Sequence, residues 1–265
     1  MYLRPLLGIL TASLVALAAR RAHALSGAGT LAAMLVGTAA VTAGWGWGAL
    51  LIAYFALSLA LTRLRGEEKQ RRTADVVAKG GARDAVQVLA NGGLFAAAAL
   101  VASLPALDPA ARAICAATAL GALAASAADS WATEIGSLAS APPRSIISGR
   151  PVAPGTSGGV NALGIGAMIA GASFVALGAR ALAIDVRVWP VIVGGFTGAI
   201  ADSVVGATLQ DRRWCDTCES GTERAVHGCG TVTRHAGGLV AMDNDLVNLI
   251  ATVVGGTVAA VLVAL

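Results

Sequence analysis

Charged residues are scarce in this 265-residue sequence. Asp, Glu, Lys and Arg make up 13% of it and hydrophobic residues 56%, whereas about 25% of a typical soluble domain is charged. No charged residue occurs in four long segments, residues 22–62, 85–107, 151–179 and 246–265. Because a helix needs about 20 apolar residues to cross a bilayer, these segments predict membrane spans rather than the core of a soluble domain.

The apolar segments also lack the two-residue alternation of β-strands, and aromatic residues make up only 4% of the sequence. This pattern does not fit a membrane β-barrel, which needs alternating segments of about ten residues. The 33 glycines suit close helix packing in lipid. We therefore expect an all-α polytopic integral membrane protein, with residues 1–265 in a single membrane domain of about eight transmembrane helices. The expected spans are Leu6–Ala19, Ser26–Ala43, Ala49–Thr62, Ala85–Leu104, Ala113–Ala128, Val160–Leu182, Val188–Gln210 and Leu246–Leu265.

Basic residues are unevenly distributed between the expected loops. Fifteen of the 19 Lys and Arg residues fall on one side of the membrane, in residues 20–21, a basic loop (63–83), a Gly-rich loop (142–158) and a Cys-containing loop (210–243). The positive-inside rule makes this side cytoplasmic. We attribute the net charge of +4 to the orientation of the protein in the lipid bilayer, and we expect no nucleic-acid partner. The expected location is a prokaryotic plasma membrane, with the active site on the cytoplasmic side.

The first segment also has a second interpretation, a secretory signal peptide with a cleavage site at residues 22–24. Arg20 and Arg21 lie between the apolar run and that site, where a signal peptide is normally uncharged. We therefore expect the first segment to remain as a span.

Acidic residues at the ends of two spans indicate a functional site. Asp129 and Glu134 follow the fifth span and Asp202 lies in the seventh, all towards the expected cytoplasmic side. Carboxylates beside apolar helices are costly, and they provide the oxygen ligands that Mg²⁺ shares with substrate phosphates. We predict that these three residues are catalytic and bind Mg²⁺. Asp129 and Glu134 are separated by about 140° on a helix, so a shared site requires a bend or a position between helices. Capping or interhelical hydrogen bonding is the alternative.

Two short patterns occur twice and in the same order, which suggests an internal repeat with the same membrane orientation. An Ala-Asp-Ser sequence occupies residues 128–130 and 201–203. Each is followed by a loop of the form G-T-x-x-x-V-x-x-x-G, at residues 155–164 and 221–230.

The first of these loops is a candidate phosphate-binding loop. Glycine-rich backbone before a helix directs several N–H groups towards one point, although such loops also simply turn the chain. No Gly-Lys-Ser/Thr follows, which excludes a Walker A loop. The residues that we expect to bind phosphate or substrate here are Gly155, Thr156, Ser157, Gly158, Gly159 and Asn161, together with Arg144 and Arg150 just upstream.

Two further polar groups open the fourth and eighth spans. Asp84, Gln87 and Asn91 fall on one helical face, with Arg83 beside them. Asn244 and Asn248 lie one helical turn apart, and helix capping explains part of that pattern equally well. We expect all six side chains to bind substrate or phosphate.

Three of the four cysteines lie close together in the Cys-containing loop. Cys215, Cys218, His227 and Cys229 fall within fifteen residues, a ligand set that suits tetrahedral Zn²⁺. The expected cytoplasmic location argues against disulfides. Structural zinc and free thiols both remain open, as does His235 in place of His227.

These motifs resemble the phytyl-phosphate kinase family, also known as domain-of-unknown-function family 92, which includes the eukaryotic transmembrane protein nineteen. The resemblance rests on GGARDAVQVLANGG, ADSWATEIG, APGTSGGVNALG, IADSVVGATLQ and MDNDLVN, and it extends from Arg63 to the C-terminus. It implies a kinase that transfers the γ-phosphate of a nucleoside triphosphate, typically CTP, to an isoprenyl monophosphate. Phytyl, geranylgeranyl and farnesyl phosphate are the implied acceptors.

A transporter or channel for a small anionic or lipid substrate is the alternative, because internal repeats and polar groups in the membrane fit that class too. Clustering of the acids at one membrane face favours the enzyme. An aromatic prenyltransferase would carry N/D-D-x-x-D motifs, and neither related stretch here has the second acid.

Overall fold

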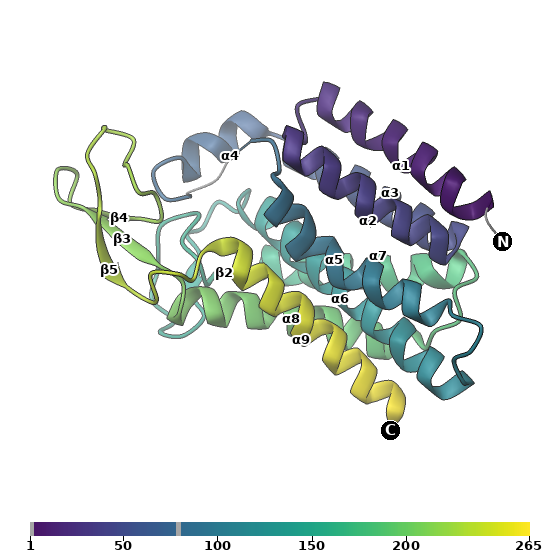
Figure 1. The fold of residues 1–265 in the computed structure, drawn as a ribbon. Helices are drawn as coiled ribbons and strands as arrows, with labels where there is room; N and C mark the ends of the chain where they lie inside the picture. The colour runs from purple at the N-terminus through teal and green to yellow at the C-terminus, as the bar shows by residue number, and fades with distance from the viewer. Residues whose placement is uncertain (1–2, 78–80) are drawn as a thin grey trace.

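The computed structural model describes residues 3–77 and 81–265 (Figure 1). Within these residues, eight long helices run back and forth, and each matches one predicted span. Seven are long and apolar enough to cross a membrane, whereas α2 has 17 residues. The helices are α1 (Leu3–Arg21), α2 (Gly27–Ala43), α3 (Trp45–Arg63), α5 (Ala85–Ala102), α6 (Pro109–Gly136), α7 (Ala162–Ala181), α8 (Val188–Thr208) and α9 (Asn244–Ala264).

The alternating helices place four connections at one end of the bundle, which we call the basic face: residues 22–26, 64–84, 137–161 and 209–243. Direct contacts join these connections. The Arg83 backbone N–H donates to Ala24 O at 3.0 Å, and the Arg72 guanidinium donates to Ser137 O at 2.8 Å. Both chain termini lie at the opposite end (Figure 1). Of the fifteen basic residues predicted on this side, Lys79 lies outside the described residues.

Helix α6 forms the centre of the bundle, with α5, α7, α8 and α9 packed around it. Asp108 caps its first turn by accepting from the N–H groups of Ala110 and Ala111, and Pro109 follows at a position that favours helix starts. Small residues allow the close packing: a Cβ on Gly195 of α8 would lie 2.6 Å from Ala124 Cβ. The 28 residues of α6 span about 42 Å. Because α6 ends at Gly136, it continues about two turns beyond Ala128, the predicted end of the fifth span.

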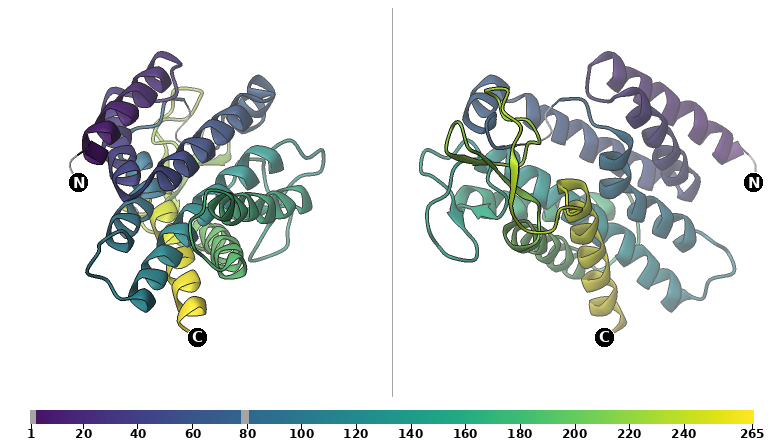
Figure 2. Two further views of the ribbon diagram at one scale, coloured as in Figure 1. Left: turned by 90° about the vertical axis from the view of Figure 1, so that its right-hand side faces the viewer. Right: turned by 60° about the vertical axis from the view of Figure 1, so that its left-hand side comes forward.

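The basic face is not entirely loop, which refines the all-α expectation. Residues Gly66–Thr73 form a short helix, α4, within the predicted basic loop. Strand β1 (Arg144–Ser145) pairs with β2 (Gly159–Val160). The Cys-containing loop forms a three-stranded antiparallel sheet, β4-β3-β5, from Arg212–Cys215 (β3), Ser220–Thr222 (β4) and Arg234–Gly237 (β5). Figure 1 shows this sheet beyond the ends of the helices, and Figure 2 gives two further views of it.

The predicted internal repeat is preserved in the helices but not in the loops. Asp129 of α6 and Asp202 of α8 lie near the same ends of two helices that run in the same direction. However, residues 155–164 lead through β2 into α7, whereas residues 221–230 leave β4 and remain in the sheet region. Similar sequences therefore adopt different structures in the two loops.

Candidate functional site

A cavity of about 1930 Å³ opens at the basic face and has two parts. The first, the polar chamber, is lined by the ends of α6 and α8, the start of α9, α4 and residues 154–161. The second, the apolar arm, continues between α1, α2 and α3. The α2 residues that line the arm run from Ala33 to Val41, so the arm extends about 12 Å along that helix. The apolar arm is lined by Ala12, Val15, Ala16, Ala33, Val36, Gly37, Val41, Leu51, Ile52 and Phe55.

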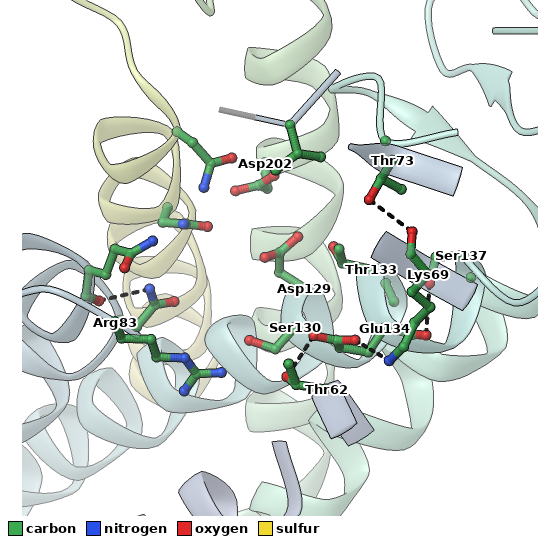
Figure 3. A pocket seen from close by; sticks show the side chains of 18 of the residues that line it. Thr62, Lys69, Thr73, Arg83, Asp129, Ser130, Thr133, Glu134, Ser137 and Asp202 are labelled. Carbon is green, nitrogen blue, oxygen red and sulfur yellow. Dashed lines mark hydrogen bonds and ion pairs between the residues drawn. The ribbon is translucent and has the colours of Figure 1, made fainter. Parts of the chain in front are cut away.

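Asp129 and Asp202 point towards each other in the polar chamber (Figure 3). Their carboxyl groups are close enough to interact directly. Asp202 Oδ2 is buried, and it receives no hydrogen bond from any of the described residues. Two facing carboxylates with an unsatisfied buried oxygen repel each other unless a cation lies between them or one of them is protonated. Carboxylate oxygens are the ligand type that Mg²⁺ prefers, so this pair fits the predicted metal.

Glu134 points away from these two aspartates. Its carboxylate accepts a hydrogen bond from Thr62 Oγ1 at 2.6 Å and forms an ion pair with Lys69 (Figure 3). Helix α6 is continuous from Asp129 to Glu134, so their expected separation around the helix is retained. The prediction that Asp129, Glu134 and Asp202 hold one or two Mg²⁺ ions stays a prediction, but Glu134 does not share one site with the two aspartates. The structure groups Asp129 with Asp202, and it places Glu134 with Lys69.

The ion pair between Lys69 and Glu134 joins α4 to α6. The Lys69 side chain is 8% exposed, and its Nζ also donates to Leu61 O at 2.5 Å. We expect Lys69→Met to destabilise the protein by about 3 kcal/mol, because removal of one partner leaves a charge without compensation. Thermal unfolding in detergent measures this loss. The double variant Lys69→Met/Glu134→Gln should recover most of the stability, and equal losses in both would contradict the pairing.

Sequence analysis missed Lys69 as a site residue. It lies in a Glu-Glu-Lys-Gln-Arg-Arg stretch, where no local signal separates it from its charged neighbours. Only the packing of α4 over the chamber identifies it. Glu223 was also missed, because only the folded chain brings it to the Gly-rich loop. It follows β4, and its carboxylate accepts a hydrogen bond from Ser157 Oγ. Burial raises the pKa of Glu223 above its usual range.

Arg83, which was predicted to bind phosphate, lines the cavity. Its backbone N–H donates to Ala24 O and its carbonyl accepts from Ser26 N, both at 3.0 Å, which fixes the chain at the start of α2. The guanidinium carbon lies 5.7 Å from the centre of the Phe55 ring. This cation–π contact holds the positive charge where the polar chamber meets the apolar arm.

The polar group after Arg83 has structural contacts in addition to its place in the cavity wall. Asp84 and Gln87 form a capping box at the start of α5, with side chain to backbone distances of 3.0 and 3.1 Å. Asn91 Nδ2 donates to Gln87 O at 2.9 Å. All three line the cavity. An Asp followed by Gln three residues later is a capping signal that the sequence already contained.

The Gly-rich loop lies in the chamber wall, but several of its polar groups have partners. The N–H groups of Thr156 and Gly159 donate within the loop, to Ala153 O and Thr156 O. Asn161 caps α7 by accepting from Gly164 N at 2.8 Å, so it occupies the position that an anion would take at that helix end. Gly158 has a φ of +77°, and a Cβ there would lie 2.6 Å from Ser203 O. Close packing against α8 therefore explains this glycine.

The remaining predicted residues divide into two groups. Asn244 and Asn248, at the start of α9, line the polar chamber. Arg144 and Arg150 do not: both are exposed on the strand–turn segment at residues 144–151, and Arg144 donates to Gly149 O at 2.9 Å. The expected phosphate contacts of these two arginines are therefore absent from the described cavity lining.

The four predicted zinc ligands come together. Cys215, Cys218, His227 and Cys229 form the one group of three or more potential metal ligands found among residues 3–77 and 81–265. The group lies in the three-stranded sheet region, away from the two aspartates.

Comparison with known proteins places the chain in one family. The family model described as integral membrane protein DUF92 matches residues 10–256. Protein PGR of Arabidopsis thaliana is 31% identical, and the match covers 93% of this chain and 92% of that protein. An uncharacterized membrane protein of Methanocaldococcus jannaschii is 27% identical, with 97% and 93% covered. No solved structure matches the chain.

Proposed function

Because the chain belongs to the DUF92 family of integral membrane proteins, we propose that it is a nucleotide-dependent kinase that converts an isoprenyl monophosphate to its diphosphate. The observation that carries this proposal is the two-part cavity, in which a polar chamber with paired aspartates continues into an apolar arm. Such a cavity is complementary to a molecule with an anionic head and a long hydrocarbon tail. The proposed nucleotide is CTP, as the resemblance to phytyl-phosphate kinases implies.

In the proposed reaction, an oxygen of the acceptor monophosphate forms a bond to the γ-phosphorus of the nucleotide. The bond from that phosphorus to the β–γ bridging oxygen breaks, and the nucleoside diphosphate leaves with the electron pair. The acceptor oxygen is already anionic, so no strong general base is needed. Catalysis then depends mainly on positioning and on charge neutralisation.

The residues of the cavity suit these two tasks. Arg83 lies at the junction of chamber and arm, where an acceptor phosphate would sit with its tail among α1, α2 and α3. Asn244 and Asn248 offer amide groups in the chamber for hydrogen bonds to phosphate oxygens. Asp129 and Asp202 would hold Mg²⁺, which supplies positive charge to the phosphates in this chemistry. The apolar arm would exclude water from the tail.

A transporter remains the second candidate, because the apolar arm reaches deep into the helices. The cavity is closed on the side of α6, α7, α8 and α9, whereas along α2 and α3 it reaches Val41 and Gly48 near the opposite end of the bundle. Helices α6, α7, α8 and α9 line it only with residues near the basic face, such as Asp129, Met168 and Asn248. Deeper in the bundle these helices pack tightly, and Leu120, Val175 and Val191 are fully buried.

The proposal is tested by supplying purified protein in detergent with CTP, Mg²⁺ and a series of isoprenyl monophosphates. Mass spectrometry would detect the diphosphate products. We expect a diphosphate and CDP in equal amounts, with ATP and GTP as alternative donors in the same assay. If folded protein forms no product with any donor or acceptor, the kinase proposal fails, and flux of isoprenyl phosphate into liposomes becomes the measurement to make.

A further inference from the structure

The three-stranded sheet on the basic face carries a cluster that the proposed kinase reaction does not use. Cys215 ends β3, Cys218 lies in the turn that follows it, and His227 and Cys229 lie in a second turn. That second turn is closed by the backbone bond from His227 N to Thr231 O at 2.9 Å. Two turns therefore each bring two side chains to the same point, where all four potential ligand atoms lie within 4.8 Å of one another.

The distances in this cluster fit one tetrahedral metal ion. With Zn–S bonds of about 2.3 Å and a Zn–N bond of about 2.0 Å, a tetrahedron separates two sulfurs by about 3.8 Å and a sulfur from a nitrogen by about 3.5 Å. The Sγ atoms of Cys215 and Cys229 are 3.6 Å apart, and Cys229 Sγ is 3.3 Å from His227 Nδ1. A disulfide is excluded for this cysteine pair, because its sulfurs would be about 2.05 Å apart.

The burial of the cluster also suits a closed structural site. Cys215 is 0% exposed and His227 is 6% exposed, while Cys218 and Cys229 lie on the outer side. Three thiols and an imidazole are ligands for a soft or borderline cation rather than for Mg²⁺. Four protein ligands leave no open coordination position, which is typical of structural rather than catalytic zinc.

We propose that Cys215, Cys218, His227 and Cys229 bind one structural Zn²⁺ ion. This ion fixes residues 219–226, which form part of the cavity wall and which we call the roof segment. The segment between the two ligand pairs, residues 219–226, makes the contacts with the rest of the basic face. Glu223 accepts from Ser157 Oγ in the Gly-rich loop. Arg224 donates to Ala74 O at 2.9 Å, and the Glu223 backbone N–H donates to Val76 O at 2.9 Å. Metal bound at both ends of this segment would hold it against residues 73–77 and 155–159.

The first test measures metal content in the full-length protein purified in detergent. We expect about one zinc ion per chain in the wild type and its loss in Cys218→Ser and His227→Ala. Cys115→Ser, which changes the remaining cysteine in α6, should retain the metal and serves as the matched control. Replacement by Co²⁺ should give the intense visible absorption of a tetrahedral thiolate site. Wild-type protein that is folded by circular dichroism, yet neither contains zinc nor takes up Co²⁺, would overturn the proposal.

A second measurement keeps the proposal testable if the cysteine variants do not fold. Removal of the metal from wild-type protein with a chelator should increase hydrogen exchange in residues 210–243 and 155–159, with little change in α6. This pattern follows because only the roof segment depends on the ion. Equal exchange with and without the metal in these segments would contradict the structural role, and equal metal content in wild type and Cys218→Ser would show adventitious binding.

Discussion

Asp129→Asn is expected to lower the rate of isoprenyl phosphate phosphorylation by about 10²-fold or more, with the protein still folded. The substitution keeps the shape of the side chain but removes one of the two charges that face each other in the polar chamber. Phosphoryl transfer depends on charge neutralisation and positioning, and loss of one electrostatic contribution of this kind typically costs about 10²–10³-fold in rate. The measurement is kcat for diphosphate formation under saturating Mg²⁺ and nucleotide.

The same helix provides a matched control. Asp108→Asn makes the identical substitution at the other end of α6, where the side chain caps the helix. Asn is also a good N-cap residue, so this variant should retain wild-type activity and stability. Activity of Asp129→Asn within about threefold of the wild type would contradict a role for the aspartate pair in charge neutralisation.

Thermal unfolding separates metal binding from catalysis at the same pair. Mg²⁺ that binds only the folded protein should raise the unfolding temperature of the wild type. The Asp129→Asn variant should show a much smaller rise. Without Mg²⁺, the variant should be at least as stable as the wild type, because it lacks the repulsion between two carboxylates. An identical response of both proteins to Mg²⁺ would remove the metal from the proposal.

Ala33→Phe is expected to shift the acceptor preference towards shorter isoprenyl chains. Ala33 lines the apolar arm on α2, and a phenyl group there would occupy space that we assign to the tail. Each buried CH₂ contributes about 0.8 kcal/mol, so exclusion of one five-carbon unit removes up to about 4 kcal/mol of binding. We therefore expect kcat/KM to fall at least about tenfold for the longest acceptor, and much less for a shorter one.

The control for this prediction is Leu35→Phe. Leu35 lies on the same helix and is 69% exposed, on a surface that does not line the cavity. It should leave the order of acceptors unchanged. If Ala33→Phe reduces activity equally for all chain lengths, the tail does not extend along α2, and the assignment of the apolar arm is wrong.

The sequence by itself determined the helices, because the signal for each one is local. A run of apolar residues near 20 in length can satisfy its backbone in lipid only as a helix, so the eight spans could be predicted from the chain. The fifth span was predicted to end at Ala128, where the polar residues begin. They continue the helix to Gly136, because the bundle and α4 provide partners for Glu134 there.

The tertiary structure alone decided how the polar residues are grouped. The sequence spacing predicted that Asp129 and Glu134 face different directions. It could not predict that Asp129 would lie near Asp202 of α8, or that Glu134 would lie near Lys69 of α4. These pairings join residues 65 or more positions apart, and they depend on how the helices pack. The four zinc ligands are the contrast. They lie within fifteen residues, so their spacing predicted the cluster, and the fold of the sheet had only to close two turns.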